Sequence, residues 1–523
     1  MLQRMPVSSR RTVLIAGAVS LMLTVAFLFL PLAGTDLAAQ VARGRFVQEY
    51  GLKPVDFRWY GGIFPFGYSL LTGPLNALIG ARGVGAVGSV VGAVAFSFLL
   101  VRTRVPRPLL GGVLGAVCLV CNLISGRTTF ALGLAFGVIA LCMVTLEEID
   151  VRLRTGLIVL AATLSTAASP VAGLFTGLAG GALLLTGRRR DGLALGIGAA
   201  VPMLVVTALF HDGGIQPFDA DSAKLVIALS IAVIFLVPGR YRAVRAGALL
   251  SALGLFAAYQ IASPIGFNAA RLALLFSVPV VAATASLPWS RLALALILIC
   301  WWQPPLVLGD LSGAGTAAAQ REFHQPLIDQ LRQRGPVGRV EVVPMRDHWE
   351  STFVADSVPL ARGWERQVDV GRNGLFYGLG SEGTLTSPEY LGWLYDNAIT
   401  YVAVPIGTSL DRWGSQEAAL IAAGLPYLQL VWGNDNWQLY KVNSAQPLVS
   451  APAKLSRSDA TGVSFDMDRP GTVVIRVHWS RWLTLSGPNG CLTPGGKWTV
   501  VRIDQPGRYR LSSGWHLAQP RRC

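Results

Sequence analysis

The stretch VLIAGAVSLMLTVAFLFLPLAGTD, residues 13 to 36, decides the fold class of this chain. It is an apolar run that ends in Leu-Ala-Gly, and the first ionisable group after it is an acid, Asp36. An α-helix of about 20 apolar residues spans the hydrocarbon core of a bilayer. We therefore predict a first membrane helix with Asp36 just beyond its end. The run lacks a small-residue cleavage pattern of the A-x-A kind, so we expect the helix to be retained rather than removed as a signal peptide.

Similar apolar runs recur up to about residue 308, which predicts an α-helical polytopic membrane domain. The chain has 523 residues of which 14% are charged, and its mean hydropathy of +0.50 is too high for a soluble protein. After the runs stop, charged residues and short alternating stretches return, so the rest should be water-exposed. The predicted domains are a transmembrane domain at 1–310, an extracytoplasmic α/β domain at 311–445 and a small extracytoplasmic β-sandwich at 446–523.

Arginine clusters in alternate short loops predict the orientation in the membrane. The net charge is +15, and in a membrane protein such clusters mark the cytoplasmic side more often than a nucleic-acid site. This places the N-terminus in the cytoplasm and the C-terminal domains outside the plasma membrane, with about eleven spans. The count depends on residues 62–82, an apolar run interrupted by Pro and Gly, which we assign to a juxtamembrane or re-entrant element. If that run crosses, the count is twelve. The clusters are Arg10-Arg11, Arg102/Arg104/Arg107, Arg152/Arg154, Arg188-Arg189-Arg190 and Arg240/Arg242/Arg245.

Polar residues gather at the predicted outer boundary and are missing from the middles of the later spans. Ion-coupled transporters need acids or bases near the bilayer midplane, so this pattern disfavours that class. Arg127 and Arg271 stand alone in outer turns, where snorkelling or helix capping could explain them. Alternatively they bind the phosphate of a lipid carrier, since guanidinium offers bidentate, permanently charged donors. Asp36 could likewise be the N-cap of an interfacial helix that begins at Leu37.

This layout resembles the GT-C class of polytopic glycosyltransferases, which use polyprenyl-phosphate-linked sugars. Its members carry an acid just after the first helix, a long first outer loop, many spans and a C-terminal extracytoplasmic domain. Residues 396–442 are similar to the α/β part of such domains, where a strand of the type x-YVxVP precedes a helix and closing strands. Other motifs resemble a group of high-GC Gram-positive polytopic membrane proteins with a C-terminal extracytoplasmic domain. These motifs are FPFGYSLLTGP, NLISGRTTFALG, SPVAGLF, GGIQPF, SPIGFNAARL and HWESTFVADSVPLARGWERQ.

The resemblance implies an inverting transfer of a sugar from a polyprenyl-phosphate-linked donor to a cell-envelope glycan or lipid acceptor. Asp36 would be the catalytic base, while Arg127, Arg271, His211 and Asn268 would bind the lipid phosphate. Members of the class often show a pair of acids in the first loop. Here Asp36 has no adjacent acid, so we assign no metal ligand and leave a divalent-metal requirement open.

The exported part has many aromatic and charged residues, a composition typical of carbohydrate binding or of a packed core with surface ion pairs. Aromatic faces stack on sugars, and charged side chains bind hydroxyl groups. For Trp349 and Trp364 the alternative is core packing. The residues expected to bind acceptor or glycan are Arg58, Tyr60, Trp349, Glu350 and Trp364.

The cysteines divide between the two parts of the chain. Cys118 and Cys121 form a CxxC within an apolar helix, but no second ligand pair accompanies them, which argues against a metal site. Cys491 and Cys523 are the only cysteines of the exported part. They could form one disulfide there.

Three functions stay open. The first is the lipid-linked-sugar glycosyltransferase, the second a transporter or flippase of a lipid-linked envelope precursor, and the third a non-catalytic scaffold that binds glycan or a partner protein. The chain has no GxSxG, zinc or P-loop motif. We expect no nucleic-acid partner, and we assign no oligomeric state.

Overall fold

The computed structural model describes residues 6–302, 308–335, 338–380, 383–515 and 523. The chain forms two compact units, and each is discontinuous in sequence. Unit 1 comprises Met1–Gln40 and Phe66–Ala314, and unit 2 comprises Val41–Pro65 and Gly315–Cys523. Unit 1 is helical, and all described strands belong to unit 2.

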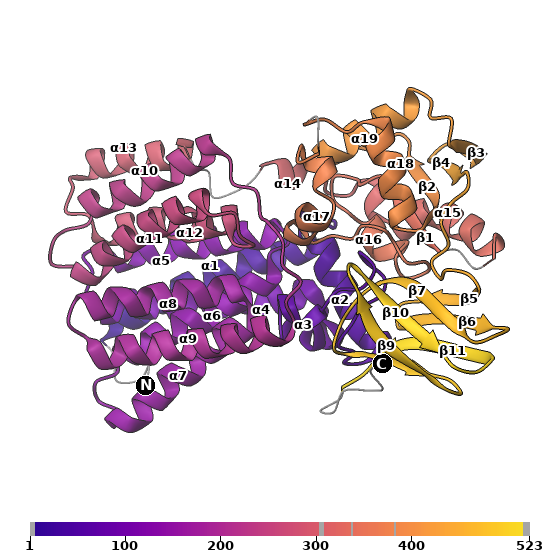
Figure 1. Ribbon diagram of the computed structural model, residues 1–523. Coiled ribbons are helices and arrows are strands. Elements are labelled where there is room, and N and C mark those ends of the chain that lie inside the picture. Colours follow the sequence, from indigo (N-terminus) through magenta and orange to yellow (C-terminus); the bar gives the residue numbers. More distant parts are fainter. Residues whose placement is uncertain (1–5, 303–307, 336–337, 381–382, 516–522) are drawn as a thin grey trace. The chain divides into compact units, whose positions relative to one another are not determined.

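Unit 1 is a bundle whose long helices run side by side (Figure 1). Among the described residues, six helices are long and apolar enough to cross a membrane, and four apolar helices of 10–17 residues join them. Helix α10, with 17 residues, brings the total to eleven helices, which equals the number of spans predicted from the sequence. The helices of unit 1 are α1 (Val7–Phe29), α4 (Thr72–Arg102), α5 (Pro108–Ile124), α6 (Thr128–Val144), α7 (Val151–Ala168), α8 (Pro170–Leu185), α9 (Arg189–Leu209), α10 (Ala220–Leu236), α11 (Arg242–Gln260), η2 (Gly266–Ala270), α12 (Arg271–Thr284), α13 (Trp289–Trp302) and α14 (Leu308–Ser312). Helices α2 (Leu37–Tyr50) and α3 (Pro65–Tyr68) each extend across the boundary with unit 2.

The interrupted apolar run near residues 62–82 forms only short helices. Helix α3 has four residues. Helix α4 is broken by non-helical backbone angles at Gly80, with φ 75°, so residues 72–79 make about two turns. The rest of α4, Ala81–Arg102, is a candidate span of 22 residues. Because a crossing needs about 20 residues, this region has room for one crossing, as the juxtamembrane assignment predicts.

Local sequence signals explain where several helices begin and how closely they pack. The side chains of Asp150 and Asp219 accept hydrogen bonds from the first backbone N–H groups of α7 and α10. Ser169 caps α8 in the same way, directly before a proline. Small residues let helices approach: a Cβ added to Gly88 of α4 would lie 2.7 Å from the backbone nitrogen of Leu132 in α6. Helices α4 and α6 therefore pack backbone against backbone.

Arginines of two predicted cytoplasmic clusters lie at one end of unit 1. Arg102 donates a 2.6 Å hydrogen bond to the carbonyl of Thr145 and a 2.7 Å hydrogen bond to Glu148. Arg188 lies 3.6 Å from Glu147 in the same loop. Loops that alternate along the chain thus meet at the same end of the bundle, as a regular up-and-down topology requires. That this end faces the cytoplasm stays a prediction.

The first part of unit 2 is an α/β layer built on a four-stranded sheet of order β1-β2-β4-β3. Strands β1 and β2 are parallel, whereas β4 is antiparallel to both of its neighbours. Strand β2 is followed by α19 and the closing strands β3 and β4, as the resemblance predicts for residues 396–442. The elements are η3 (Ala317–Ala319), α15 (Arg321–Gln333), β1 (Arg339–Val342), α16 (Glu350–Phe353), α17 (Arg366–Arg372), η4 (Gly374–Tyr377), α18 (Ser387–Asp396), β2 (Ile399–Pro405), α19 (Arg412–Ala422), β3 (Leu428–Gly433) and β4 (Trp437–Val442).

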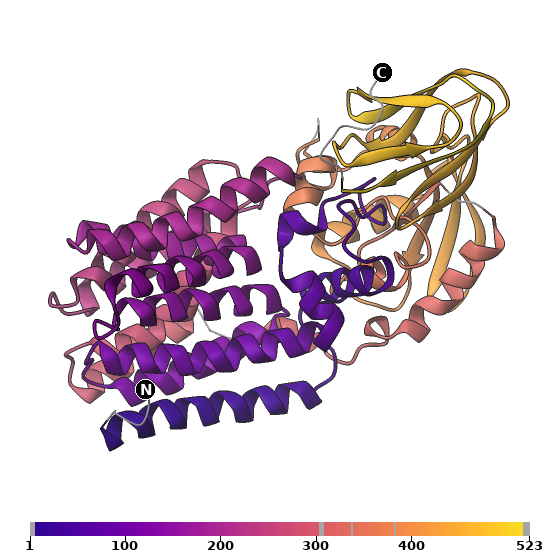
Figure 2. The ribbon, with the colours of Figure 1, turned by 90° about the horizontal axis from the view of Figure 1, so that it is seen from below.

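The C-terminal part of unit 2 is an antiparallel β-sandwich, seen as yellow arrows in Figure 2. One sheet has the order β7-β10-β9 and the other β5-β6-β11-β8. Alternate apolar residues of both sheets, such as Val473 and Phe465, form one buried core, which confirms the predicted sandwich. The strands are β5 (Lys454–Asp459), β6 (Gly462–Met467), β7 (Gly471–His478), β8 (Leu483–Ser486), β9 (Gly490–Gly495), β10 (Trp498–Ile503) and β11 (Gly507–Ser513).

The segment 41–65 departs from the predicted domain boundaries, which placed it in the transmembrane domain. It belongs to unit 2. The backbone N–H of Phe57 donates to the carbonyl of Ala460 at 3.0 Å, and the N–H of Leu360 donates to the carbonyl of Arg58 at 2.7 Å. The first loop therefore completes the α/β layer and the sandwich instead of capping the helical bundle.

Candidate active site

Asp36, Arg127 and Arg271 come together in unit 1. Oδ2 of Asp36 lies 3.4 Å from Nε of Arg127 and 3.6 Å from Nη2 of Arg271. The side chains are 26%, 23% and 15% exposed in that order, so the cluster is mostly enclosed yet reachable from solvent. One carboxylate faces two guanidinium groups, which leaves an excess of one positive charge.

Helix starts hold the three side chains in place. Asp36 directly precedes α2, Arg127 occupies the N-cap position of α6, and Arg271 is the first residue of α12. Because the N-terminus of a helix carries a partial positive charge, it stabilises a nearby carboxylate or phosphate. Asp36 can therefore cap α2 and face the arginines at the same time, so the capping role left open by the sequence does not exclude a chemical one.

A tight contact between two turns sets Asp36 beside Arg127. The N–H of Asp36 donates to the carbonyl of Ser125 at 3.3 Å. Gly126 has φ 79°, and a Cβ added to it would lie 2.4 Å from the backbone nitrogen of Leu37. Glycine is needed there because any side chain would meet both backbone strain and a clash.

The two arginines keep their hydrogen-bonding capacity. Arg271 lies over the ring of Phe130, with its guanidinium carbon 5.3 Å from the ring centroid. Nε of Arg127 is buried and has no hydrogen-bond partner among the described residues. Both distances to Asp36 exceed the usual 2.7–3.2 Å of an N–H···O hydrogen bond. The cluster is thus held by charge attraction, with donors left for an added anion.

A buried polar network next to the cluster was missed by the sequence analysis. Gln40 is 1% exposed, and its Oε1 accepts a 2.6 Å hydrogen bond from Thr129 while its Nε2 donates to the hydroxyl of Tyr68 at 3.2 Å. Its backbone carbonyl accepts from Asn76 at 3.1 Å. One signal was present in the sequence: Gln40 follows Asp36 by four residues, which places both on one face of α2.

His211 and Asn268 do not join the cluster. Within the described residues, neither side chain makes a hydrogen bond or ion pair with Asp36, Arg127 or Arg271. His211 is exposed in the turn before α10. The structure thus brings the two arginines together with Asp36, and phosphate binding by His211 and Asn268 stays a prediction.

Arg58 and Tyr60, predicted to bind acceptor or glycan, are buried in unit 2. Arg58 is 1% exposed, and it donates to Asp56 at 2.9 Å and to Asp356 at 2.7 Å. Tyr60 is 3% exposed, and its hydroxyl accepts the backbone N–H of Glu365 at 3.2 Å. This corrects the prediction, because their polar atoms already have partners inside the fold.

Trp349, Glu350 and Trp364 need the same correction. Trp349 stacks on Phe353 with ring centroids 5.4 Å apart, and Trp364 stacks on His348 at 3.4 Å. Oε1 of Glu350 lies 3.2 Å from Nδ1 of His348. All three side chains are buried, so core packing, the alternative left open for the tryptophans, describes them and no indole face is available to a sugar.

His348 has a carboxylate at each ring nitrogen. Its Nδ1 faces Glu350, and its Nε2 lies 3.1 Å from Asp411, which also pairs with Arg366. A neutral imidazole has a single N–H, so two acceptors favour the imidazolium. Burial acts to lower the pKa of His348, but the hydrogen bonds to Asp411 and Glu350 outweigh it and the pKa is raised.

A second buried cluster places two carboxylates on one guanidinium. Arg362 donates to Glu341 and to Glu417, and Glu417 also accepts the hydroxyl of Tyr390 at 2.8 Å. Glu341 and Glu417 are 0% exposed. Burial raises the pKa of both glutamates, and Arg362 offsets only part of that rise. Arg362 therefore balances one of the two carboxylate charges.

No group of three or more His, Cys, Asp or Glu side chains that could hold a metal ion occurs among the described residues. Of the acids nearest to Asp36 in sequence, Asp56 pairs with Arg58 in unit 2. Glu49 accepts the hydroxyl of Tyr50 at 2.9 Å.

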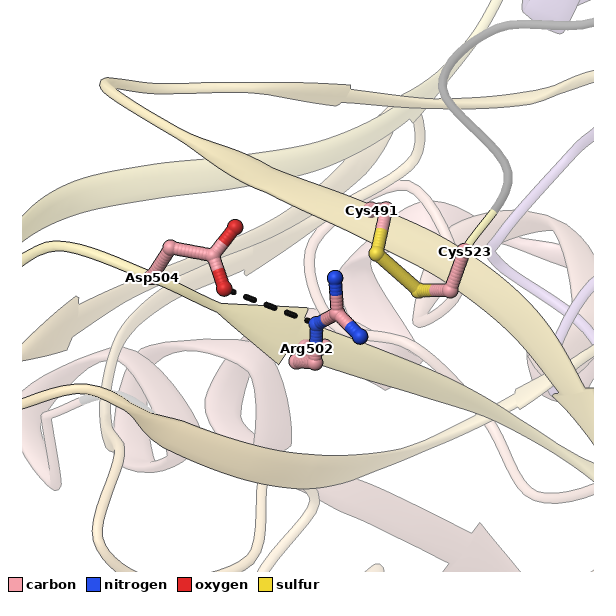
Figure 3. The surroundings of a disulfide bond; sticks show 4 residues. All are labelled: Cys491, Arg502, Asp504 and Cys523. Carbon is pink, nitrogen blue, oxygen red and sulfur yellow. Dashed lines mark ion pairs between the residues drawn. A yellow bond between two sulfur atoms is a disulfide. The ribbon is translucent and has the colours of Figure 1, made fainter.

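Cys491 and Cys523 form a disulfide (Figure 3), with Cα atoms 5.0 Å apart. The Arg502–Asp504 ion pair, at 3.5 Å, is drawn in the same view. Cys118 and Cys121 are free thiols in α5. The bridge ties the end of the chain to strand β9.

A family model and several solved structures are similar to parts of this chain. A family model described as a domain of unknown function, DUF8823, matches residues 450–523. No curated protein matches the chain. The cryo-EM structure of the arabinofuranosyltransferase AftD from Mycobacteria is 14% identical, with a TM-score of 0.45 over 96% of this chain and 57% of that chain. This chain thus spans less than two-thirds of the AftD chain.

Crystal structures of ArnT from Cupriavidus metallidurans are also similar. The apo structure is 14% identical, with a TM-score of 0.41 over 82% of this chain and 97% of that chain. The structure bound to undecaprenyl phosphate is 16% identical, with a TM-score of 0.34 over 84% and 99%. The fold and the site of the present chain define a multi-pass membrane protein whose helical unit carries an Asp–Arg–Arg cluster.

Proposed function

We propose that this protein is a membrane glycosyltransferase of the GT-C class, which transfers a sugar from a polyprenyl-phosphate-linked donor to an envelope glycan or lipid acceptor on the outer face. The observation that carries the proposal is the single carboxylate oxygen of Asp36 within 3.6 Å of guanidinium nitrogens of both Arg127 and Arg271. A base and the cations for a leaving phosphate must act on one anomeric centre, so they have to lie close together.

In the proposed reaction, the acceptor hydroxyl gives its proton to Asp36 while its oxygen attacks the anomeric carbon. The bond between that carbon and the phosphate oxygen breaks, and its electron pair stays on the lipid phosphate. Arg127 and Arg271 stabilise the charge that develops there, because guanidinium–phosphate hydrogen bonds are charge-assisted. Attack opposite to the phosphate inverts the anomeric configuration.

The test is Asp36→Asn, which keeps the size and most of the capping ability of the side chain but cannot accept a proton at neutral pH. We expect normal membrane levels and transfer reduced by a factor of about 10² or more. Glu49→Gln is the matched control, since it neutralises another carboxylate of α2 that is exposed. The assay is release of polyprenyl phosphate from synthetic short-chain polyprenyl-phosphate pentoses and hexoses by the reconstituted protein with envelope extract as acceptor. Full release by Asp36→Asn would refute the assignment of Asp36 as the base.

A further inference from the structure

The contact distances in the cluster are too short for a sugar to lie between base and phosphate. In inverting glycoside hydrolases, the two groups that flank the anomeric centre are about 6.5–9.5 Å apart, which leaves room for the attacking molecule. Asp36 lies 3.4 Å and 3.6 Å from the cations that would receive the phosphate. The structure therefore shows base and cations in direct contact, an arrangement that a bound donor has to part.

We propose that Asp36 occupies the anion site of Arg127 and Arg271 in the unliganded protein, and that the phosphate of the donor displaces it and so frees the base. This inference rests on the proposed function, because it takes the ligand to be a phosphate monoester or diester on a lipid. A lipid-linked sugar phosphate is a diester with one negative charge, as a carboxylate has, and its bridging and non-bridging oxygens offer more acceptor positions to two guanidinium groups, so it can take the place of the Asp36 carboxylate.

The side chains around Asp36 fit an exchangeable anion. Arg58, a structural arginine of unit 2, holds Asp56 through hydrogen bonds of 2.9–3.1 Å at 1% exposure. Arg127 and Arg271, in contrast, contact Asp36 at longer distances and are partly exposed. Phe130 supports the guanidinium of Arg271 through its ring face and not through a hydrogen bond. Exchange of the carboxylate for a phosphate leaves this support intact.

Displacement would give the reaction an order. Before the donor binds, the carboxylate of Asp36 is neutralised by two cations and is a poor acceptor for a hydroxyl proton. After the phosphate has taken its place, Asp36 faces the acceptor without these partners. The base thus becomes available only when a phosphate occupies the two arginines.

The experiment measures binding of farnesyl phosphate to the full-length protein in detergent by isothermal titration calorimetry, without any transfer step. If Asp36 competes with phosphate, Asp36→Asn binds farnesyl phosphate about tenfold more tightly than wild type, because the competing charge is gone. Arg271→Gln should weaken binding, and adding Asp36→Asn to it should give a smaller gain than in the wild type, since the competition needs both arginines. Glu49→Gln should leave the affinity unchanged.

Equal or weaker binding by Asp36→Asn overturns the displacement proposal, as does an equal gain in Glu49→Gln. Inorganic phosphate is titrated in parallel. If the affinities of Asp36→Asn and wild type for inorganic phosphate also differ tenfold, displacement is supported and the competition is with the phosphate group itself. If the affinities differ only for farnesyl phosphate, displacement is supported for the lipid-linked form. The proposed function fails separately. Tighter binding with full transfer by Asp36→Asn refutes the assignment of Asp36 as the base and supports the displacement. Lost transfer with unchanged binding supports the base and refutes the displacement.

Discussion

Replacing Arg362 by Met should make the stability of unit 2 strongly dependent on pH. Arg362 is 3% exposed and donates to Glu341 and Glu417, whose side chains are 0% exposed. Methionine fills much of the same volume but leaves two buried carboxylates without a cation. Such groups take up protons rather than stay charged in an apolar environment.

The size of the effect follows from the cost of that proton. Because the variant loses one positive charge, it has to bind one proton more than the wild type to keep the charge of the buried cluster unchanged. Holding a proton on a glutamate of unperturbed pKa about 4.3 costs roughly 3.7 kcal/mol at pH 7 and about 1 kcal/mol at pH 5, at about 1.36 kcal/mol per pH unit. The value at neutral pH falls within the 3–5 kcal/mol range known for breaking buried ion pairs. For a domain of this size, the loss lowers the melting temperature by about 7–15 °C at pH 7 and about 2–4 °C at pH 5.

The measurement is thermal unfolding of the purified full-length protein in detergent at both pH values. Arg362→Met combined with Glu341→Gln and Glu417→Gln is the matched control, since it removes the charges together and should lose the pH dependence. A drop in melting temperature that is equal at pH 5 and pH 7 would refute the reasoning, because it would show that lost packing and not proton uptake sets the cost.

Three further predictions concern other parts of the chain. His348→Gln should flatten the fall in stability of unit 2 above about pH 6.5, as measured by thermal unfolding. Because the pKa of His348 is raised in the fold, its contribution to stability is fully present below the unfolded pKa and is lost as pH rises through the folded pKa. An equal slope in wild type and variant would contradict it. Gly126→Ala should reduce transfer at least tenfold, because the added Cβ pushes Leu37 away. The control Gly51→Ala is also at positive φ but has nothing within 4 Å of the added Cβ, so it should retain transfer. Equal transfer activities of the two variants would exclude the turn contact as the cause. Cys523→Ser should destabilise unit 2 by about 3–4 kcal/mol, the loop-closure entropy expected for a sequence separation of 32, and an unchanged melting temperature in the absence of reductant would argue against this.

Much of the fold could be predicted because it depends on local patterns. Apolar run length defines helices such as α1, and strict alternation defines sandwich strands such as β7. The place of residues 41–65 could not be predicted, because it depends on pairings such as Phe57 with Ala460. These residues are some four hundred positions apart, and no local signal marks the pairing.

The predicted site residues likewise differ in whether a local sequence pattern or a long-range contact decides their place. Asp36, Arg127 and Arg271 could be singled out because each is an ionisable residue next to an apolar run, and the structure brings them together; their roles stay a prediction. The five residues expected to bind acceptor are buried, which could not be foreseen because a buried polar network and a sugar-binding surface use the same residue types. Trp364 on His348 is an example: only the structure shows that the indole face is covered from within.

The divided sequence of unit 2 limits how the chain can thread a membrane. Residues 41–65 and 315–523 hydrogen-bond to each other, so both pieces must be on one side of the bilayer. A chain that returns to the side it left crosses an even number of times. Within the described residues, ten helices, α4 to α13, lie between the two pieces besides the short α3, η2 and α14, and ten is even. If each of these ten helices crosses, a further crossing by residues 62–82 would make the number odd and place the two pieces of unit 2 on opposite sides, so the divided unit 2 agrees with eleven spans and not with twelve.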